Sequence, residues 1–401
     1  MRSISELFLT AVVLVSVLGG CGADERHHVR SGPLASATSP ATTSATSPAT
    51  TSPISPPAQP APTTAFYGLN VNRLFNDGTY SPAEINGQLS DVAATGVTVA
   101  RSDALWELSE PHPPVNGVHT YSWTFDDTIA GDLAAHGLSW LPIVDYTATW
   151  NQSVAGVDHS PPASDADFAA YAAALARRYG PGGAFWAAHP ELSARPVSTV
   201  EIWNEPDNRQ FWRPTPDAGA YALLYVTARA AIAAAVPSTR VLIGGLTDPM
   251  ATLPAMVAAE PGLAGQADGV AVHPYGIPLQ MIGKLHDDRR TLTTLGMGSV
   301  PLYVTEFGWV IHPRGALGYV PASRRPGYIR SSLAALGHLN CGIAAVVYYT
   351  WITPEHNPTD REDWFGIQPP DGRPGPDLHA YADGLHAAQA PRATFNVCNS
   401  G

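Results

Sequence analysis

Two glutamates occupy similar positions at the ends of short apolar segments. Glu205 lies in Glu-Ile-Trp-Asn-Glu-Pro (201–206) and Glu306 in Leu-Tyr-Val-Thr-Glu-Phe-Gly-Trp (302–309). Each follows a run typical of a buried β-strand and precedes residues that end a strand. Two facing carboxylates can cleave a glycosidic bond, because one attacks the anomeric carbon while the other donates and later removes a proton. The pattern predicts such a pair if the fold brings the two together.

The elements that must position these glutamates alternate in type. Eight short apolar, β-branched runs are separated by alanine-rich segments with helical periodicity. The runs are 66–71, 97–103, 139–145, 199–205, 241–246, 269–273, 302–306 and 343–351. Repeated strand–helix units predict an α/β protein with a closed parallel (β/α)8 TIM barrel over residues 66–401. An open doubly wound sheet is the alternative, disfavoured because no Gly-x-Gly-x-x-Gly follows the first run.

Helix boundaries are marked by local signals. Ser81-Pro82-Ala83-Glu84 predicts a capping box, and Gly96 would end that helix. Ser164 is the expected N-cap of a helix over 165–179, and a helix over 218–236 should stop before Pro237.

Polar residues gather where the expected strands end, which is the rim that carries the chemistry of barrel enzymes. In chain order they are Asn70, Arg101, Asp103, Asp145, Tyr146, Asn204, Glu205, Asp248, His273, Tyr275, Glu306 and Trp351. Glu205 follows the fourth run and Glu306 the seventh, so we expect their carboxylates to face each other across the mouth.

The two motifs resemble the fourth- and seventh-strand signatures of glycoside hydrolase clan A. Within the clan, Glu-Ile-Trp-Asn-Glu-Pro-Asp (201–207), followed by Phe211-Trp212, is most similar to family 39 and then to family 5. The resemblance implies a retaining glycosidase that needs no cofactor, with Glu205 as acid/base and Glu306 as nucleophile.

The same resemblance implies supporting roles for other residues. Arg101 would orient the nucleophile, Asn204 would bind the sugar 2-hydroxyl, and His273 and Tyr275 would lie beside the carboxylates. Trp351 would form the aromatic floor of the subsite. Independently of the resemblance, three tryptophans that follow strands are candidate sugar platforms, namely Trp150, Trp212 and Trp309. Glu201 and Asp207 flank the acid/base and are expected to be structural partners.

One departure from family 39 bears on the activity. Its β-xylosidases and iduronidases carry an added β-sandwich domain, for which this chain has no room after its eighth expected strand. We therefore expect a compact member acting on a polysaccharide or oligosaccharide. Two alternatives stay open: a transglycosylase with the same residues, and a non-catalytic surface lipoprotein that binds glycans.

The N-terminus has the features of an export signal. Arg2 precedes the apolar run 7–18, which is shorter than the ~20 residues of a membrane span, and the run leads to Leu-Gly-Gly-Cys ending at Cys21. This end resembles a bacterial lipobox, so residues 1–21 are expected to be a lipoprotein signal peptide. Ordinary secretory cleavage is the alternative. Residues 22–65, rich in Ser, Thr, Pro and Ala, are expected to form a disordered linker.

The chain has three cysteines. If Cys21 carries lipid, Cys341 and Cys398 form an even pair in an oxidising compartment, and we expect a disulfide between them. Two free thiols are the alternative. We expect an extracellular protein, anchored to the cell surface by lipid or secreted.

Composition excludes several classes. The net charge is −12, and Lys284 is the sole lysine, so a nucleic-acid partner is not expected. No His-Glu-x-x-His or Cys-x-x-Cys motif occurs, which gives no support to a metal site, and no Gly-x-Ser-x-Gly motif occurs, which gives none to a serine-nucleophile elbow. The charge also favours a neutral glycan over a strongly anionic one. We expect a monomer and no second membrane span.

Overall fold

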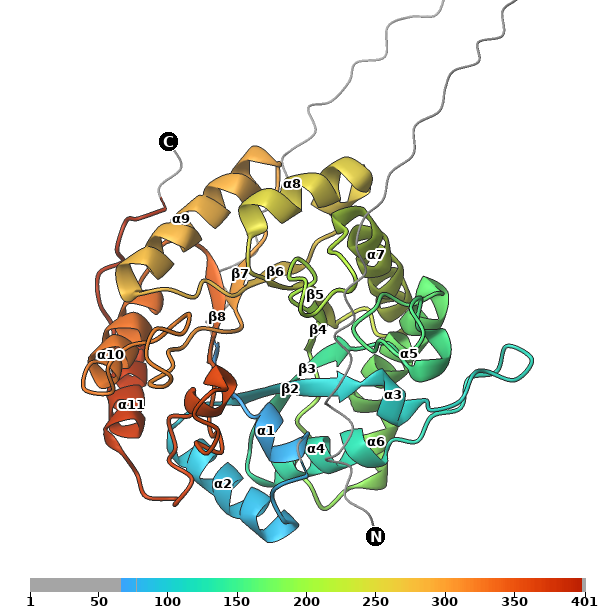
Figure 1. Cartoon of the computed structure of the whole chain (residues 1–401). Coiled ribbons are helices and arrows are strands. Elements are labelled where there is room, and N and C mark those ends of the chain that lie inside the picture. Colours follow the sequence, from blue (N-terminus) through green and yellow to red (C-terminus); the bar gives the residue numbers. More distant parts are fainter. Residues whose placement is uncertain (1–65, 77, 399–401) are drawn as a thin grey trace, which may run out of the picture. The chain divides into compact units, whose positions relative to one another are not determined.

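The protein forms a closed barrel of eight parallel strands, paired in chain order from β1 to β8 and back to β1 (Figure 1). This computed structural model describes residues 66–76 and 78–398. The strands are β1 (Phe66–Asn70), β2 (Val99–Leu105), β3 (Ser139–Asp145), β4 (Thr199–Asn204), β5 (Arg240–Leu246), β6 (Gly269–Val272), β7 (Leu302–Val304) and β8 (Ile343–Tyr348). The predicted (β/α)8 barrel is confirmed, and the open sheet is wrong because β8 pairs with β1.

Helices surround the barrel on the outside (Figure 1). They are α1 (Asn72–Phe75), α2 (Pro82–Ala94), α3 (Trp106–Ser109), α4 (Thr124–Ala135), α5 (Asp165–Tyr179), α6 (Ala184–Ala188), α7 (Ala218–Ala235), α8 (Pro249–Ala259), α9 (Pro278–Thr294), α10 (Arg325–Leu336) and α11 (Pro376–Gln389), with short 3-10 turns at Thr149–Asn151, Pro261–Gly265 and Arg361–Trp364.

The expected helix caps are present. Ser81 and Glu84 form the capping box of α2, and Ser164 accepts a hydrogen bond from the Asp167 amide at the start of α5. Asp217 caps α7 in the same way, a signal that the sequence reading did not use.

The interior of the barrel is filled by side chains in layers. Leu242, Ala271 and Tyr303 form one apolar cluster with Ala344 and Ala345. Val99, Leu141 and Val347 form a second cluster. The predicted site lies beyond these clusters, at the carboxyl ends of the strands.

Helix α7 is long and apolar enough to count as a candidate membrane span, which the sequence analysis did not expect beyond the N-terminus. By length and composition it qualifies, with a mean hydropathy of 1.4 over Ala218–Ala235. However, the hydroxyls of Tyr221 and Tyr225 donate hydrogen bonds to carbonyls of Ile202 in β4 and Val241 in β5. These contacts make α7 part of the shell around the barrel.

The predicted disulfide between Cys341 and Cys398 is confirmed. Next to it, the Asn340 side chain accepts hydrogen bonds from the amides of Val397 and Cys398. The C-terminal segment is thus fixed to the turn before β8. The predicted signal peptide, Cys21 and the linker lie outside the described residues and stay predictions.

Removing this disulfide should lower the free energy of unfolding. The bridge joins residues 57 positions apart, and a loop of that size corresponds to about 4 kcal/mol of lost chain entropy in the unfolded state. We expect a Cys341→Ser, Cys398→Ser double variant to lose about 2–4 kcal/mol in urea unfolding. Equal unfolding curves for the wild type with and without reductant would contradict this.

Candidate active site

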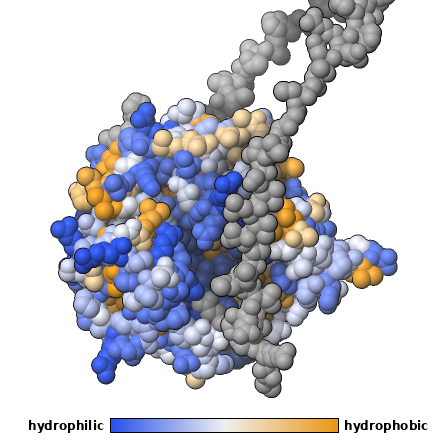
Figure 2. All heavy atoms as spheres, in the orientation of Figure 1, coloured by the Kyte–Doolittle hydropathy of each residue, from blue (hydrophilic) through white to orange (hydrophobic). Residues whose placement is uncertain are grey.

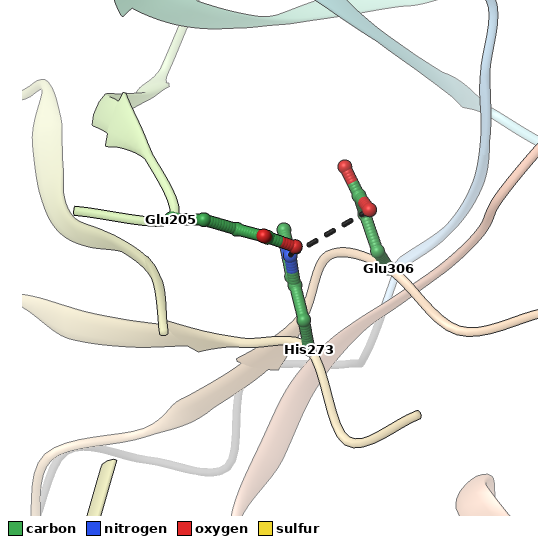
Figure 3. A group of neighbouring side chains, drawn as sticks. All are labelled: Glu205, His273 and Glu306. Atoms are coloured by element: carbon green, nitrogen blue, oxygen red, sulfur yellow. Dashed lines mark hydrogen bonds and ion pairs between the residues drawn. The ribbon is translucent and has the colours of Figure 1, made fainter. Parts of the chain in front are cut away.

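Glu205 and Glu306 meet at the mouth of the barrel, where His273 lies between them (Figure 3). One oxygen of each carboxylate and one ring nitrogen of His273 all lie within 4.8 Å of one another. Both glutamates are largely buried, with 7% and 6% of their surface exposed. Retaining glycosidases use carboxyl groups ~5–5.5 Å apart, so this spacing is suited to direct attack by one carboxylate.

The backbone of β4 departs from a regular strand next to Glu205. Residues three positions apart normally point to opposite faces of a strand, yet Glu201 and Asn204 both contact Arg101. Trp203 makes this arrangement possible by adopting a φ of 68°, and Glu205 follows with a φ of 46°. Such conformations cost on the order of 1–3 kcal/mol each and are concentrated at functional sites.

Arg101 holds the carboxylates of the site in place from the centre of the barrel. Its Nε and Nη2 donate to the two oxygens of Glu201 at 2.9 and 3.0 Å, and Nη2 also donates to Asn204 Oδ1 at 3.0 Å. Nη1 donates to Glu306 Oε1 at 2.7 Å. Because the guanidinium is fully buried, its attraction to the carboxylates of Glu201 and Glu306 is little screened by water. The predicted structural role of Glu201 is confirmed.

Each catalytic candidate has a further hydrogen-bond donor of its own. The Tyr275 hydroxyl donates to Glu306 Oε2 at 2.7 Å. The Asn208 side chain donates to Glu205 Oε2 at 2.6 Å. Glu306 therefore receives the Arg101 guanidinium and a hydroxyl, whereas Glu205 receives an amide and the shorter of two contacts from His273, whose Nδ1 also lies 3.6 Å from Glu306 Oε2.

His273 connects Glu205 to the floor of the site. Its Nδ1 lies 2.8 Å from Glu205 Oε1, and its Nε2 lies 3.2 Å from Thr305 Oγ1. The Thr305 hydroxyl donates to Glu201 Oε1 at 3.3 Å, so its oxygen must accept the proton of His273 Nε2. A Cβ at Gly245 would collide with the imidazole, which explains the absence of a side chain there.

The charge of His273 follows from its neighbours. Burial by itself lowers the pKa of His273, but the carboxylates of Glu306 and Glu205 outweigh burial and raise that pKa above its ordinary value. His273 Nδ1 and Glu205 Oε1 can therefore share one proton between them, while Nε2 donates to Thr305.

Glu205, His273 and Glu306 could each offer one atom to a metal ion. The surroundings oppose this use, because the Arg101 guanidinium already contacts Glu306 and would repel a cation. The group is better suited to proton transfer and nucleophilic attack.

The structure corrects part of the aromatic prediction. Trp351 was expected to form the sugar floor, but it is fully buried and its indole donates to Gln88 of α2, so its ring offers no accessible face in this structure. Trp212 is equally buried, packed against Trp203 and Tyr221, which contradicts a platform role. The prediction for Trp351 failed because β8 ends at Tyr348, so the alternation of side chains along the strand does not extend to Trp351.

The other two predicted platforms differ from each other. Trp309 is 1% exposed, and its indole donates to the Gly276 carbonyl, so its ring offers no open face in this structure. Trp150 is half-buried and packs edge-on against Trp106, while its indole donates to the Glu110 carbonyl.

Sequence reasoning missed Tyr349 as a residue of the site. It is half-buried just past the end of β8, and its hydroxyl donates to Glu362 at 3.3 Å. Burial, with further contributions from the charges of Glu362 and Glu306, raises the pKa of Tyr349 well above its ordinary value. Tyr349, rather than Trp351, is therefore the aromatic residue of this strand end next to Glu306. The signal in the sequence that could have identified Tyr349 was its position two residues before Trp351.

Asp103 binds two asparagines that follow β1. Its carboxylate accepts hydrogen bonds from the side chains of Asn72 and Asn76. Burial raises the pKa of Asp103 to about 6, against the opposing effect of Arg101. In the view of Figure 1, Figure 2 shows hydrophilic residues around a hollow.

Replacing Arg101 should destabilise the protein. An Arg101→Gln variant leaves two buried carboxylates without their cation, and breaking a buried ion pair from one side costs about 3–5 kcal/mol. Urea unfolding would measure this loss. Arg330→Gln is the matched control, because its ion pair with Asp383 is exposed and should cost at most about 1 kcal/mol. Equal effects of the two variants would contradict the central role of Arg101.

Comparison with known proteins places the fold. No protein-family model and no curated protein sequence matches the chain. Solved structures do match. A family 39 β-xylosidase from Caulobacter crescentus has a TM-score of 0.61 at 21% identity, covering 81% of this chain and 72% of its own. The family 39 enzyme from Xanthomonas axonopodis pv. citri has a TM-score of 0.62 at 20% identity, covering 81% and 67%.

A subfamily 18 member of family 5 from Bifidobacterium longum subsp. longum has a TM-score of 0.58 at 12% identity, covering 83% of this chain and 80% of its own. These similarities agree with the resemblance found in the sequence motifs. The chain has the barrel fold of glycoside hydrolase families 39 and 5, as expected for clan A.

Proposed function

We propose that this protein is a retaining glycoside hydrolase, with Glu306 as nucleophile and Glu205 as acid/base. The observation that carries the proposal is the pair of carboxylates within 4.8 Å, each with different partners. Arg101 and Tyr275 surround Glu306, and His273 and Asn208 surround Glu205.

The difference in partners supports the division of roles. A nucleophile must be held in a fixed orientation, and hydrogen bonds from the Arg101 guanidinium and the Tyr275 hydroxyl to its two oxygens do this for Glu306. An acid/base must exchange a proton, and Glu205 lies 2.8 Å from a histidine ring nitrogen.

The proposed reaction has two steps. In the first, a Glu306 oxygen bonds to the anomeric carbon, the glycosidic bond breaks, and Glu205 gives its proton to the leaving oxygen. In the second, Glu205 removes a proton from water, whose oxygen displaces Glu306 from the anomeric carbon. When Glu306 leaves, its carboxylate regains a negative charge, which the hydrogen bonds from Arg101 and Tyr275 would stabilise. Two inversions restore the original anomeric configuration.

The substrate side of the proposal rests on charge and on the structural relatives. The relatives include a β-xylosidase, a glucosidase and an exo-β-1,4-mannosidase, which differ in the sugar named. We propose a carbohydrate substrate for this chain, and a neutral one because acidic groups such as Asp103 and Glu362 lie near the mouth. A monomeric extracellular enzyme, lipid-anchored at Cys21 or secreted, belongs to the same proposal.

Variants of the two glutamates test the assignment. Glu306→Ala should abolish turnover of any accepted glycoside, because no covalent intermediate can form. Glu205→Ala should lower kcat by about 10²–10⁴-fold on alkyl glycosides, since general acid catalysis is worth that much. On aryl glycosides with good leaving groups the first step needs little protonation, so the loss there should be smaller.

Initial rates on matched alkyl and aryl glycosides would measure both effects. Glu191→Ala is the control, because Glu191 is an exposed glutamate away from the strand ends. Wild-type rates in a Glu205, Glu306 double variant would refute the proposal.

The stereochemistry of the product is a second test. Proton NMR recorded during the first minutes of hydrolysis should show the sugar released with the anomeric configuration of the substrate, because the spacing of the two carboxylates favours double displacement. Initial release of the opposite anomer would show that water attacks directly and that Glu306 is not a nucleophile.

A further inference from the structure

Three half-buried aromatic rings lie together on the loops that follow β3 and β4. They belong to Tyr146 and His159, which follow β3, and to Phe211, which follows β4. The ring centroids of Tyr146 and His159 are 4.1 Å apart. The Phe211 ring is nearly parallel to that of Tyr146, with centroids 6.4 Å apart and an interplanar angle of 10°. We call these three residues the aromatic strip.

Tyr146 connects the aromatic strip to the catalytic groups. Burial raises the pKa of Tyr146 well above its ordinary value, nearby carboxylates including that of Glu205 add to the rise, and a hydrogen bond with the Asn204 side chain opposes it. Its ring also packs edge-on against Trp203, with centroids 5.3 Å apart. The strip therefore begins beside Asn204 and Glu205.

Phe211 lies outside the core that its neighbours fill. Trp212 is buried against Trp203 and Tyr221, and the Trp203 indole donates to the Phe211 carbonyl at 2.7 Å. In the part of the chain that the structure describes, Trp203 and Trp212 belong to the main apolar cluster, whereas Phe211 does not. The backbone of Phe211 is thus fixed, while part of its surface stays open to solvent.

The two loops that carry the aromatic strip are joined to each other. The Arg213 amide, after β4, donates to the His159 carbonyl, after β3, at 2.9 Å. The His159 ring is held in turn, because its Nδ1 lies 2.7 Å from an oxygen of Asp158. A ligand that packs on the strip therefore loses little free energy in ordering it.

The proposed reaction gives the aromatic strip a place along the substrate. Glu205 gives its proton to the leaving oxygen, so the leaving group lies against Glu205, while the anomeric carbon lies against Glu306. Figure 3 shows these two side chains approaching each other from opposite sides. Because Tyr146 contacts Asn204, directly before Glu205, the strip begins where the leaving group would lie.

We propose that the aromatic strip is a binding subsite for the leaving group, a second sugar whose ring packs on Phe211 and Tyr146. A sugar ring presents an apolar face of C–H groups that packs well on aromatic rings. This inference rests on the proposed hydrolase function and narrows its substrate to a glycan of at least two sugars.

Substrates that differ in their leaving group test the subsite. The set contains the β-1,4-linked disaccharides of glucose, xylose and mannose, the sugars named for the structural relatives. It also contains their methyl β-glycosides, which have no second ring. We expect Phe211→Ala to lower the ratio of kcat/KM for the disaccharide to kcat/KM for the methyl glycoside about 3–10-fold, the strength of one aromatic contact.

Three further variants separate recognition from folding. Phe211→Leu keeps an apolar side chain without the ring and should lower the ratio as Phe211→Ala does. Phe211→Tyr keeps the ring and should restore the wild-type ratio. Phe395→Ala is the matched control, because Phe395 is 51% exposed and is bridged to Leu339 before β8, near the amino end of that strand. This control should leave the ratio unchanged.

Binding without cleavage gives a readout that does not need the hydrolase activity. Disaccharides linked through sulfur resist hydrolysis, so ligand-observed NMR titration can compare their affinity with that of the methyl thioglycosides. We expect the disaccharide of the accepted sugar to bind at least about threefold more tightly to the wild type. Phe211→Leu should remove this difference.

The outcomes distinguish the subsite from the hydrolase activity. Cleavage of a disaccharide with an unchanged ratio in Phe211→Ala and Phe211→Leu would overturn the subsite and leave the hydrolase. Binding of a sulfur-linked disaccharide that depends on Phe211, without cleavage of any glycoside in the set, would keep the strip as a sugar-binding site and count against the hydrolase. Failure of every disaccharide to bind would overturn the subsite.

Discussion

The structure of the site depends on one buried cation. Arg101 extends from β2 to Glu201 on β4 and to Glu306 just after β7, so three separate strands converge on a single guanidinium. Removing such a charge from water is costly, and only near-complete pairing offsets the cost. The planar guanidinium provides this, since one edge faces Glu201 and Nη1 remains for Glu306. The closed barrel is what keeps these strands at the required distances.

The parts of this arrangement that could be predicted from sequence were those governed by strand periodicity. Arg101, Glu205 and Glu306 each end or follow an apolar run, and the closure of the barrel turns these strand ends into one rim. Periodicity gives no information beyond the last paired residue. For that reason Trp351 was expected at the rim, although the chain turns after Tyr348 and presents Tyr349 instead.

Contacts made by short side chains could not be predicted from the sequence either. Thr305 carries no signal in the sequence beyond its place before Glu306, yet its hydroxyl links His273 to Glu201. Asn208 binds Glu205 only because the backbone turns back after the positive φ of Glu205. Both contacts follow from local backbone geometry, which residue type and spacing do not determine.

The single lysine has a practical consequence. Lys284 is the only side-chain amine in the chain, and it lies exposed on α9. Amine-directed reagents would therefore attach one fluorophore or one surface tether at a known position, apart from any free N-terminus. A reporter placed there would sit one hydrogen bond from the Tyr275 backbone and two from Glu306.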